Sequence, residues 1–119
     1  MLKSELYVQV SPNRFVVRNI ADGRTVDRVA EKPFSRQGAL LVNLLNAEAA
    51  LKPMIAEAKS AFTFRIHVLM HPLKLPDADW TDVEQKAFRT IALGAGATTA
   101  KSWTGAPLTD AEVREKLRS

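Results

Sequence analysis

The chain has 119 residues, of which 46% are hydrophobic and 25% charged, with a net charge of +4 and no cysteine. This length suits one domain with one core, and the composition is that of an ordinary globular protein. The lack of cysteine excludes disulfides and cysteine-based zinc sites, and no run approaches the ~20 apolar residues of a membrane span. The basic residues are scattered without interleaved aromatics, which argues against a nucleic-acid-binding surface. We therefore expect a single cytoplasmic domain over residues 1–119.

The N-terminal quarter of the chain alternates apolar and polar residues, as β-strands do. The segment LYVQV at residues 6–10 has the period of a half-buried strand. A turn follows at residues 11–13, and residues 14–20 alternate again. Asp22-Gly23 is a hairpin signal that leads into a third strand over residues 24–30. The sequence thus predicts a meander of three antiparallel strands.

Four arginines of this meander have the parity to share one face of the sheet. A basic stripe for a partner is one interpretation, but we favour a solvated face, because antiparallel sheets commonly expose one side to water. The four are Arg14, Arg18, Arg24 and Arg28.

For residues 34–46 the sequence does not decide between a strand, a helix and a partner-binding interface. Pro33 ends the meander, residues 34–38 are a predicted loop, and residues 40–45 hold leucines too densely to choose between an extended and a helical entry. We favour a buried core over a partner-binding edge, because a small protein rarely exposes so large an apolar patch without a use for it. The leucines are Leu40, Leu41, Leu44 and Leu45.

A helix is predicted to follow, with Asn46 as its N-cap and its end near Lys59. Pro53 falls inside this helix. Because proline lacks a backbone N–H and its ring clashes with the preceding turn, we expect it to kink or split the helix.

Apolar residues at every second position predict a strand over residues 62–72, closed by Pro72 and followed by a loop over residues 73–80. The alternating residues are Phe62, Phe64, Ile66, Val68 and Met70.

His67 and His71 are the only histidines, and they lie four residues apart on this strand. At that spacing their side chains point the same way but stand ~13 Å apart, beyond joint reach of one metal ion. We expect no metal site, and a structural or surface role for both. Serine nucleophile motifs are absent as well.

The segment TDVEQKAFRTIALGAGA, residues 81–97, predicts a capped helix. Thr81 and Glu84 have the spacing of a capping box, and Gly94 and Gly96 bring the helix to an end. One apolar face recurs at the helical period; its members are Val83, Ala87, Phe88, Ile91, Ala92 and Ala95.

The C-terminal segment has an extended run at residues 98–104 and a second capping box, Thr109 with Glu112, that opens a helix to about Leu117. Trp80 and Trp103 flank the helix of residues 81–97. We expect them to pack at the end of the sheet rather than to bind a partner.

The helix of residues 81–97 also resembles a sequence motif of a known protein family. Its Thr-x-Val-Glu, the following Ala87 and the ALGAGA segment are similar to T-x-V-E-R-R-A-I…A-x-x-A-G-A of MreB-type bacterial actins, and weaker similarity covers residues 6–17 and 62–73. This family implies an α/β, ribonuclease H-like subdomain. The implied order is three antiparallel strands, a helix, a parallel strand at 62–72, a helix, a parallel strand at 98–104 and a last helix.

The resemblance also implies a nucleotide site, and this sequence departs from it. The family's first phosphate loop resembles Asp-x-Gly-Thr, where this chain has Gln9, Ser11 and Pro12; the carboxylate has become an amide and proline has removed an N–H donor. The second phosphate loop and the adenosine motif belong to the half of the family fold that would follow Ser119. Glu84, beside Thr81, matches the family's water-orienting glutamate, but we favour its role in the capping box.

We therefore expect no catalysis, cofactor or metal, and interpret the chain as a degenerate MreB-like interaction module linked to cell shape. Its expected partner is a bacterial actin homologue or a second copy of itself. The alternatives are a nucleotide-binding protein or ATPase with an atypical site, and a basic nucleic-acid-binding domain.

Overall fold

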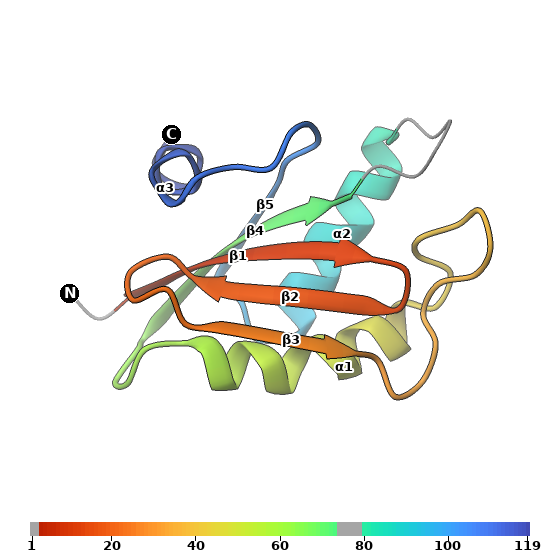
Figure 1. Ribbon diagram of the computed structural model, residues 1–119, viewed down its shortest axis with the longest axis horizontal. Coiled ribbons are helices and arrows are strands. Elements are labelled where there is room, and N and C mark those ends of the chain that lie inside the picture. The colour runs from red at the N-terminus through yellow and green to blue at the C-terminus, as the bar shows by residue number, and fades with distance from the viewer. Residues whose placement is uncertain (1–2, 74–79) are drawn as a thin grey trace.

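The fold is α/β, with a five-stranded mixed sheet and three helices (Figure 1). This computed structural model describes residues 3–73 and 80–119. The strands are β1 (Lys3–Ser11), β2 (Arg14–Asn19), β3 (Thr25–Val29), β4 (Arg65–Pro72) and β5 (Thr99–Ser102). The helices are α1 (Leu44–Ala58), α2 (Asp82–Gly94) and α3 (Asp110–Arg118). None of the helices in these residues is long and apolar enough to cross a membrane.

The strand order is β3-β2-β1-β4-β5. The first three strands pair antiparallel, β4 lies parallel to β1, and β5 lies parallel to β4. The predicted meander and the two later parallel strands are therefore confirmed. The loop expected over residues 73–80 lies almost entirely outside the described residues.

The two turns of the meander each require a residue in the left-handed region. Asn13 adopts φ 56° in the β1–β2 turn and Gly23 adopts φ 78° in the β2–β3 turn. Asparagine and glycine are the residues that tolerate this conformation best. In the second turn, the Asp22 Oδ1 atom accepts a hydrogen bond from the Arg24 N–H at 2.8 Å.

The predicted common face of the four arginines is wrong. Across β2 and β3, Arg14 lies opposite Val29, whereas Arg28 lies opposite Phe15, a core residue. Directly opposed residues point to the same side of a sheet. Since even-numbered residues of β2 oppose odd-numbered residues of β3, Arg14 and Arg18 lie on one face and Arg24 and Arg28 on the other.

Helices cover both faces of the sheet (Figure 1), so β1 is buried on both sides rather than half-buried. The larger core joins one face of the sheet to α1 and α2; its large members include Leu6, Val8, Phe15, Leu51, Met54, Ile55, Met70, Phe88 and Ile91. The smaller core lies under α3 and contains Tyr7, Ile20, Leu69 and Val113.

Helix α1 starts three residues earlier than predicted. Its N-cap is Asn43, whose side-chain oxygen accepts a hydrogen bond from the Asn46 N–H at 2.9 Å. The Asn46 side chain instead donates to the Pro33 carbonyl at 2.8 Å. The helix runs through Pro53 without a break, so the expected split is wrong. Ala49 and Pro53 are both exposed, and water can therefore hydrate the Ala49 carbonyl that lacks an N–H partner.

Helices α2 and α3 confirm both predicted capping boxes. The buried face of α2 is formed by Phe88, Ile91, Ala92 and, at the C-cap, Ala95. Val83 is wrongly placed on that face by the sequence pattern; it lies in the first turn of α2 and is 79% exposed.

Strand β4 begins at Arg65, later than predicted, and Phe62 and Phe64 are 85% and 77% exposed. The preceding turn is held by Thr63, whose hydroxyl donates to the Ser60 carbonyl at 2.6 Å and lies 2.8 Å from the Ser4 hydroxyl. The ladder with β1 begins where Lys3 lies opposite Arg65, so both phenylalanines precede it and lie outside the core.

Candidate functional site

The residues at the positions matched to the nucleotide site of MreB-type actins belong to separate elements. Gln9 and Ser11 point to the same face of β1 as Tyr7, which is the face that α3 covers. Thr81 and Glu84 belong to α2, which packs on the opposite face. Pro12 is exposed in the β1–β2 turn. Gln9 and Ser11 thus lie on the α3 side of β1, whereas Thr81 and Glu84 lie at the exposed start of a helix that packs on the other side.

The Glu84 carboxylate is engaged at the start of α2. Its Oε1 atom accepts hydrogen bonds from the Thr81 N–H at 3.2 Å and from the Thr81 hydroxyl at 3.0 Å. The Thr81 hydroxyl in turn accepts from the Glu84 N–H at 3.2 Å. This reciprocal arrangement satisfies backbone groups of the first helical turn, which accounts for Glu84 without a ligand.

His71 is the most deeply buried titratable side chain of the α3 face, at 1% exposure. Its Nε2 atom lies 3.0 Å from the Gly105 carbonyl, which can only accept, so Nε2 carries the proton. Nδ1 is then the acceptor, and the Tyr7 hydroxyl donates to it at 2.5 Å. The Tyr7 oxygen accepts from the Leu108 N–H at 3.2 Å. Every polar atom in this chain of bonds therefore has a partner.

Burial shifts the pKa values of both side chains away from the charged forms. It lowers the pKa of His71 below its usual value, against the opposing effect of the Gly105 carbonyl. It likewise raises the pKa of the Tyr7 hydroxyl. Both groups are therefore neutral at pH 7, as the hydrogen-bond pattern requires.

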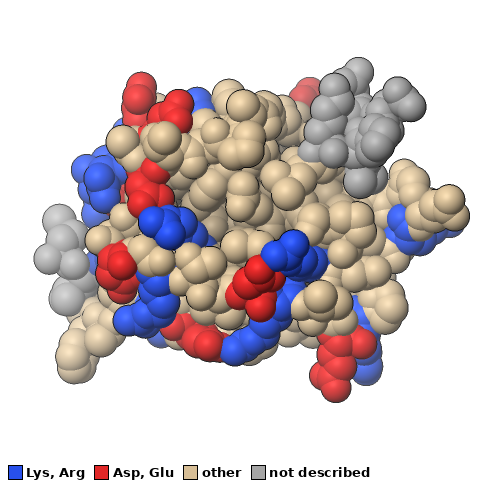
Figure 2. All heavy atoms as spheres, in the orientation of Figure 1, with Lys and Arg blue, Asp and Glu red and all other residues tan. Residues whose placement is uncertain are grey.

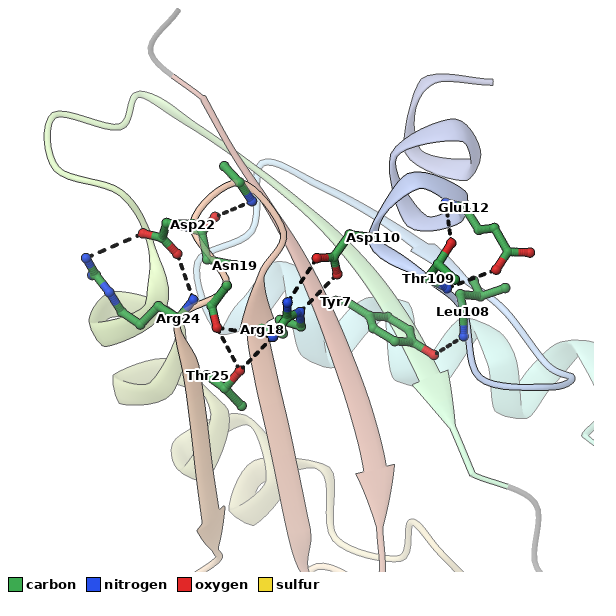
Figure 3. A network of polar contacts seen from close by, with 12 residues as sticks. Tyr7, Arg18, Asn19, Asp22, Arg24, Thr25, Leu108, Thr109, Asp110 and Glu112 are labelled. Atoms are coloured by element: carbon green, nitrogen blue, oxygen red, sulfur yellow. Dashed lines mark hydrogen bonds and ion pairs between the residues drawn. The ribbon is translucent and has the colours of Figure 1, made fainter.

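This chain of bonds fixes the segment before α3, and ion pairs fix α3 itself. Figure 3 shows the bond between Leu108 and Tyr7 and the ion pair of Arg18 with Asp110. The Arg18 guanidinium donates from Nε and Nη2 to the two Asp110 oxygens at 2.9 and 3.0 Å. At the other end of the helix, Arg118 donates to Glu5 at 3.2 and 3.1 Å. These contacts are structural: they hold α3 on the sheet.

Both histidines are engaged in contacts within the protein. His67 contacts the Thr99 hydroxyl at 2.6 Å and His71 is engaged as described above. Within residues 3–73 and 80–119, no three metal-ligating side chains lie close enough to hold an ion.

The two tryptophans pack within the molecule, as expected. Trp80 meets Phe88 edge to face, with ring centroids 5.8 Å apart. The Trp103 N–H donates to the Ala106 carbonyl at 2.9 Å, and the Lys116 ammonium lies 4.0 Å from the centre of the indole ring.

Charged side chains on the face drawn in Figure 2 lie in mixed pairs rather than in a field of one sign. Arg14 pairs with Asp27, and Arg18 with Asp110. Neutralised arginines attract phosphate less than free ones do, so this face gives no support to nucleic-acid binding.

Three exposed aliphatic side chains lie close together in the sequence at the start of α1. Val42, Leu44 and Leu45 are 47%, 43% and 78% exposed, whereas Leu40 is buried at 2%. We call the three exposed residues the apolar surface. No residue between Arg36 and Glu48 is charged. The leucine-rich stretch therefore divides: its first part belongs to the core, and its last part faces solvent.

Some of these features had no signal in the sequence. Tyr7 and His71 are 64 residues apart, and their contact depends on the parallel pairing of β1 and β4. The dense leucines did indicate the apolar surface, but not which of them would be exposed. No protein-family model matches this chain, and no curated protein is similar enough to be reported as a relative.

Proposed function

We propose that this chain is a non-catalytic interaction module related to one ribonuclease H-like subdomain of the MreB-type bacterial actins. The relationship is supported by the sheet, in which three antiparallel strands are followed by two strands parallel to the first. It is also supported by the capped helix α2, which carries the Thr81-to-Ala97 motif between the two parallel strands.

The lack of catalysis is supported by the arrangement of the former nucleotide-site residues. A phosphate cradle requires several backbone N–H groups that converge on one point, and Pro12 contributes none. Glu84 is bonded to Thr81, and Gln9 points to the other face of the sheet from α2. Calorimetric titration with Mg-ATP is expected to show no heat of binding at micromolar concentrations. A micromolar signal that is lost in Glu84→Ala would overturn this part of the proposal.

The interaction itself is supported by the apolar surface. Three exposed aliphatic residues within an uncharged stretch have the composition of an interface centre, where charged residues are depleted. The partner we propose is a bacterial actin homologue or a second copy of the chain, and the setting is the cytoskeleton that determines cell shape.

The variant Leu45→Glu tests this surface without weakening the fold. Leu45 lies in the first turn of α1, which contains no acidic residue. A carboxylate near a helix N-terminus is stabilising, so the variant should melt no earlier than the native chain. Val83→Glu is the matched control, because Val83 is equally exposed in the first turn of α2 and lies outside the apolar surface.

The measurements are gel filtration with light scattering and pull-down of a purified bacterial actin. We expect association in at least one of them, lost in Leu45→Glu and kept in Val83→Glu. A chain that is monomeric and retains no actin, or an association that Leu45→Glu leaves unchanged, would contradict the proposal.

A further inference from the structure

Strand β3 forms one edge of the sheet, and α1 runs along it (Figure 1). Between them lies a groove of about 410 Å³. One wall consists of residues 28–32, and the other of a single stripe of α1. We call it the β3–α1 groove; the stripe is Asn46, Ala49, Ala50, Pro53 and Met54.

The outer edge of β3 carries backbone groups that no strand in the described residues pairs with. Hydrogen-bonded and non-bonded pairs alternate along an antiparallel ladder. The Asn19 N–H donates to the Arg24 carbonyl at 2.8 Å, and the Ala30 N–H to the Asn13 carbonyl at 2.7 Å. Even-numbered residues of β3 therefore bond to β2, and the N–H and C=O groups of Thr25, Asp27 and Val29 point outward.

The groove lies beside the C-terminal end of this edge, because Arg28 and Val29 are the β3 residues that line it. Side chains of an added strand that stand opposite residues 28 and 30 would be placed there. Apart from Asn46, its α1 wall is built of small and apolar residues: Ala49 and Ala50 leave space that larger side chains would fill, and the ring of Pro53 closes it. The opposite wall carries the charged residues Arg28, Glu31 and Lys32. From Asn46 to Met54 the helix advances about 12 Å, the length of about four extended residues. The groove thus accommodates two alternate side chains of one strand.

We propose that the β3 edge and the β3–α1 groove bind an extended segment of a partner protein by strand addition. The partner's backbone pairs with Thr25, Asp27 and Val29, and its apolar side chains at alternate positions enter the groove. Such binding obtains affinity from main-chain hydrogen bonds and specificity from the pockets for alternate side chains. The groove shares no residue with the apolar surface, although its Asn46 directly follows Leu45, and the inference does not depend on the proposed function.

A second copy of the chain fits this edge less well than an unrelated segment. Two β3 edges paired about a two-fold axis, with all three outward residues bonded, would place Asp27 directly opposite its own copy. Like charges in that position are destabilising. The partner is therefore a heterologous peptide rather than this strand.

The test starts from a phage-displayed library of random 12-residue peptides selected on the full chain. Selected peptides, synthesised with a fluorescent label, are titrated by fluorescence anisotropy. We expect apolar residues at alternate positions and dissociation constants in the micromolar range, about 1–100 μM. Amide exchange followed by NMR should slow at Thr25, Asp27 and Val29 when the peptide is bound, and these three amides should exchange faster than those of Val26 and Arg28 when it is not.

Two pairs of variants locate the binding. Val29→Pro removes one outward N–H without touching the bonds to β2, and is expected to weaken binding about tenfold or more, while Val29→Thr keeps the N–H and stays within about twofold. Ala49→Leu fills the groove and should weaken binding similarly. Ala56→Leu, on the same helix but outside the groove, should not.

Slow exchange at Val26 and Arg28 shows that Val29→Pro still folds. The proposal is overturned if no peptide is selected, if the selected peptides bind Val29→Pro and Ala49→Leu as tightly as the native chain, or if protection appears away from β3. Protection of the β3 amides that rises with protein concentration alone would assign the edge to a second copy and would also overturn it.

Discussion

The Tyr7 hydroxyl donates a 2.5 Å hydrogen bond to Nδ1 of His71, and this contact joins the side chains of β1 and β4. His71 extends the connection to the Gly105 carbonyl, and Tyr7 extends it to the Leu108 N–H. Two side chains of adjacent parallel strands thus determine where residues 105–108 lie, and through them where α3 begins.

Removal of the Tyr7 hydroxyl should destabilise the fold. Tyr7→Phe keeps the ring in the smaller core but leaves the Leu108 N–H and His71 Nδ1 without partners, at a cost of about 1–3 kcal/mol. Urea unfolding followed by tryptophan fluorescence measures the loss. Val16→Ala, a partly exposed change on neighbouring β2, is the control. A Tyr7→Phe variant as stable as the native chain would show that the bonds contribute nothing.

The stability of the protein should fall as the pH drops below about 6.5. The pKa of His71 is lowered in the folded state, so below its ordinary value of 6.5 the unfolded chain takes up a proton that the folded chain does not. The contribution is complete above pH 6.5 and is lost as the pH falls, with a slope of at most about 1.4 kcal/mol per pH unit.

Urea unfolding from pH 7.5 to 5 measures this slope, and two variants assign it. His71→Gln should remove most of it. His67→Gln should keep most of it, although burial also lowers the pKa of His67, because that ring is only partly buried. An equal slope in native and His71→Gln proteins would exclude His71 as its source.

Pro53→Ala should stabilise the protein. Alanine restores the N–H that the Ala49 carbonyl lacks and is about 3 kcal/mol more favourable than proline inside a helix. Alanine also gives the unfolded chain more conformational freedom, which offsets up to about 1 kcal/mol of this stabilisation. The free energy of unfolding should therefore rise by about 2 kcal/mol. Thermal unfolding followed by circular dichroism is the measurement, and a lower melting temperature would mean that the Pro53 ring makes packing contacts that outweigh the backbone.

Phe62→Gly should also stabilise, although it removes an aromatic side chain. Phe62 has φ 57° and is 85% exposed, so the glycine relieves left-handed strain of about 1–2 kcal/mol while little burial is lost. The greater flexibility of glycine offsets up to about 1 kcal/mol of that gain. Phe64→Gly is the control: it is similarly exposed but has no positive φ, and it should be destabilising. The two variants would change stability in the same direction if strain at Phe62 were negligible.

Local signals in the sequence predicted the elements well. The capping boxes of Thr81 with Glu84 and Thr109 with Glu112 set the starts of α2 and α3, because each contact lies within one helical turn. Asp22-Gly23 set the second hairpin for the same reason. The N-cap predicted at Asn46 was wrong: Asn43 caps α1, and the Asn46 side chain donates instead to the carbonyl of Pro33, 13 residues earlier, a contact that no local pattern reveals.

The sequence by itself determined which segments become strands and helices, since periodicity, turn residues and caps act over a few positions. The tertiary structure alone decided which side of each element faces the core and which side faces solvent. Register placed Arg28 against α1 and Arg14 on the opposite face, and the packing of α1 buried Leu40 but left Leu45 in solvent. The physical reason is that one residue of register reverses every side chain of a strand, and no local pattern records that choice.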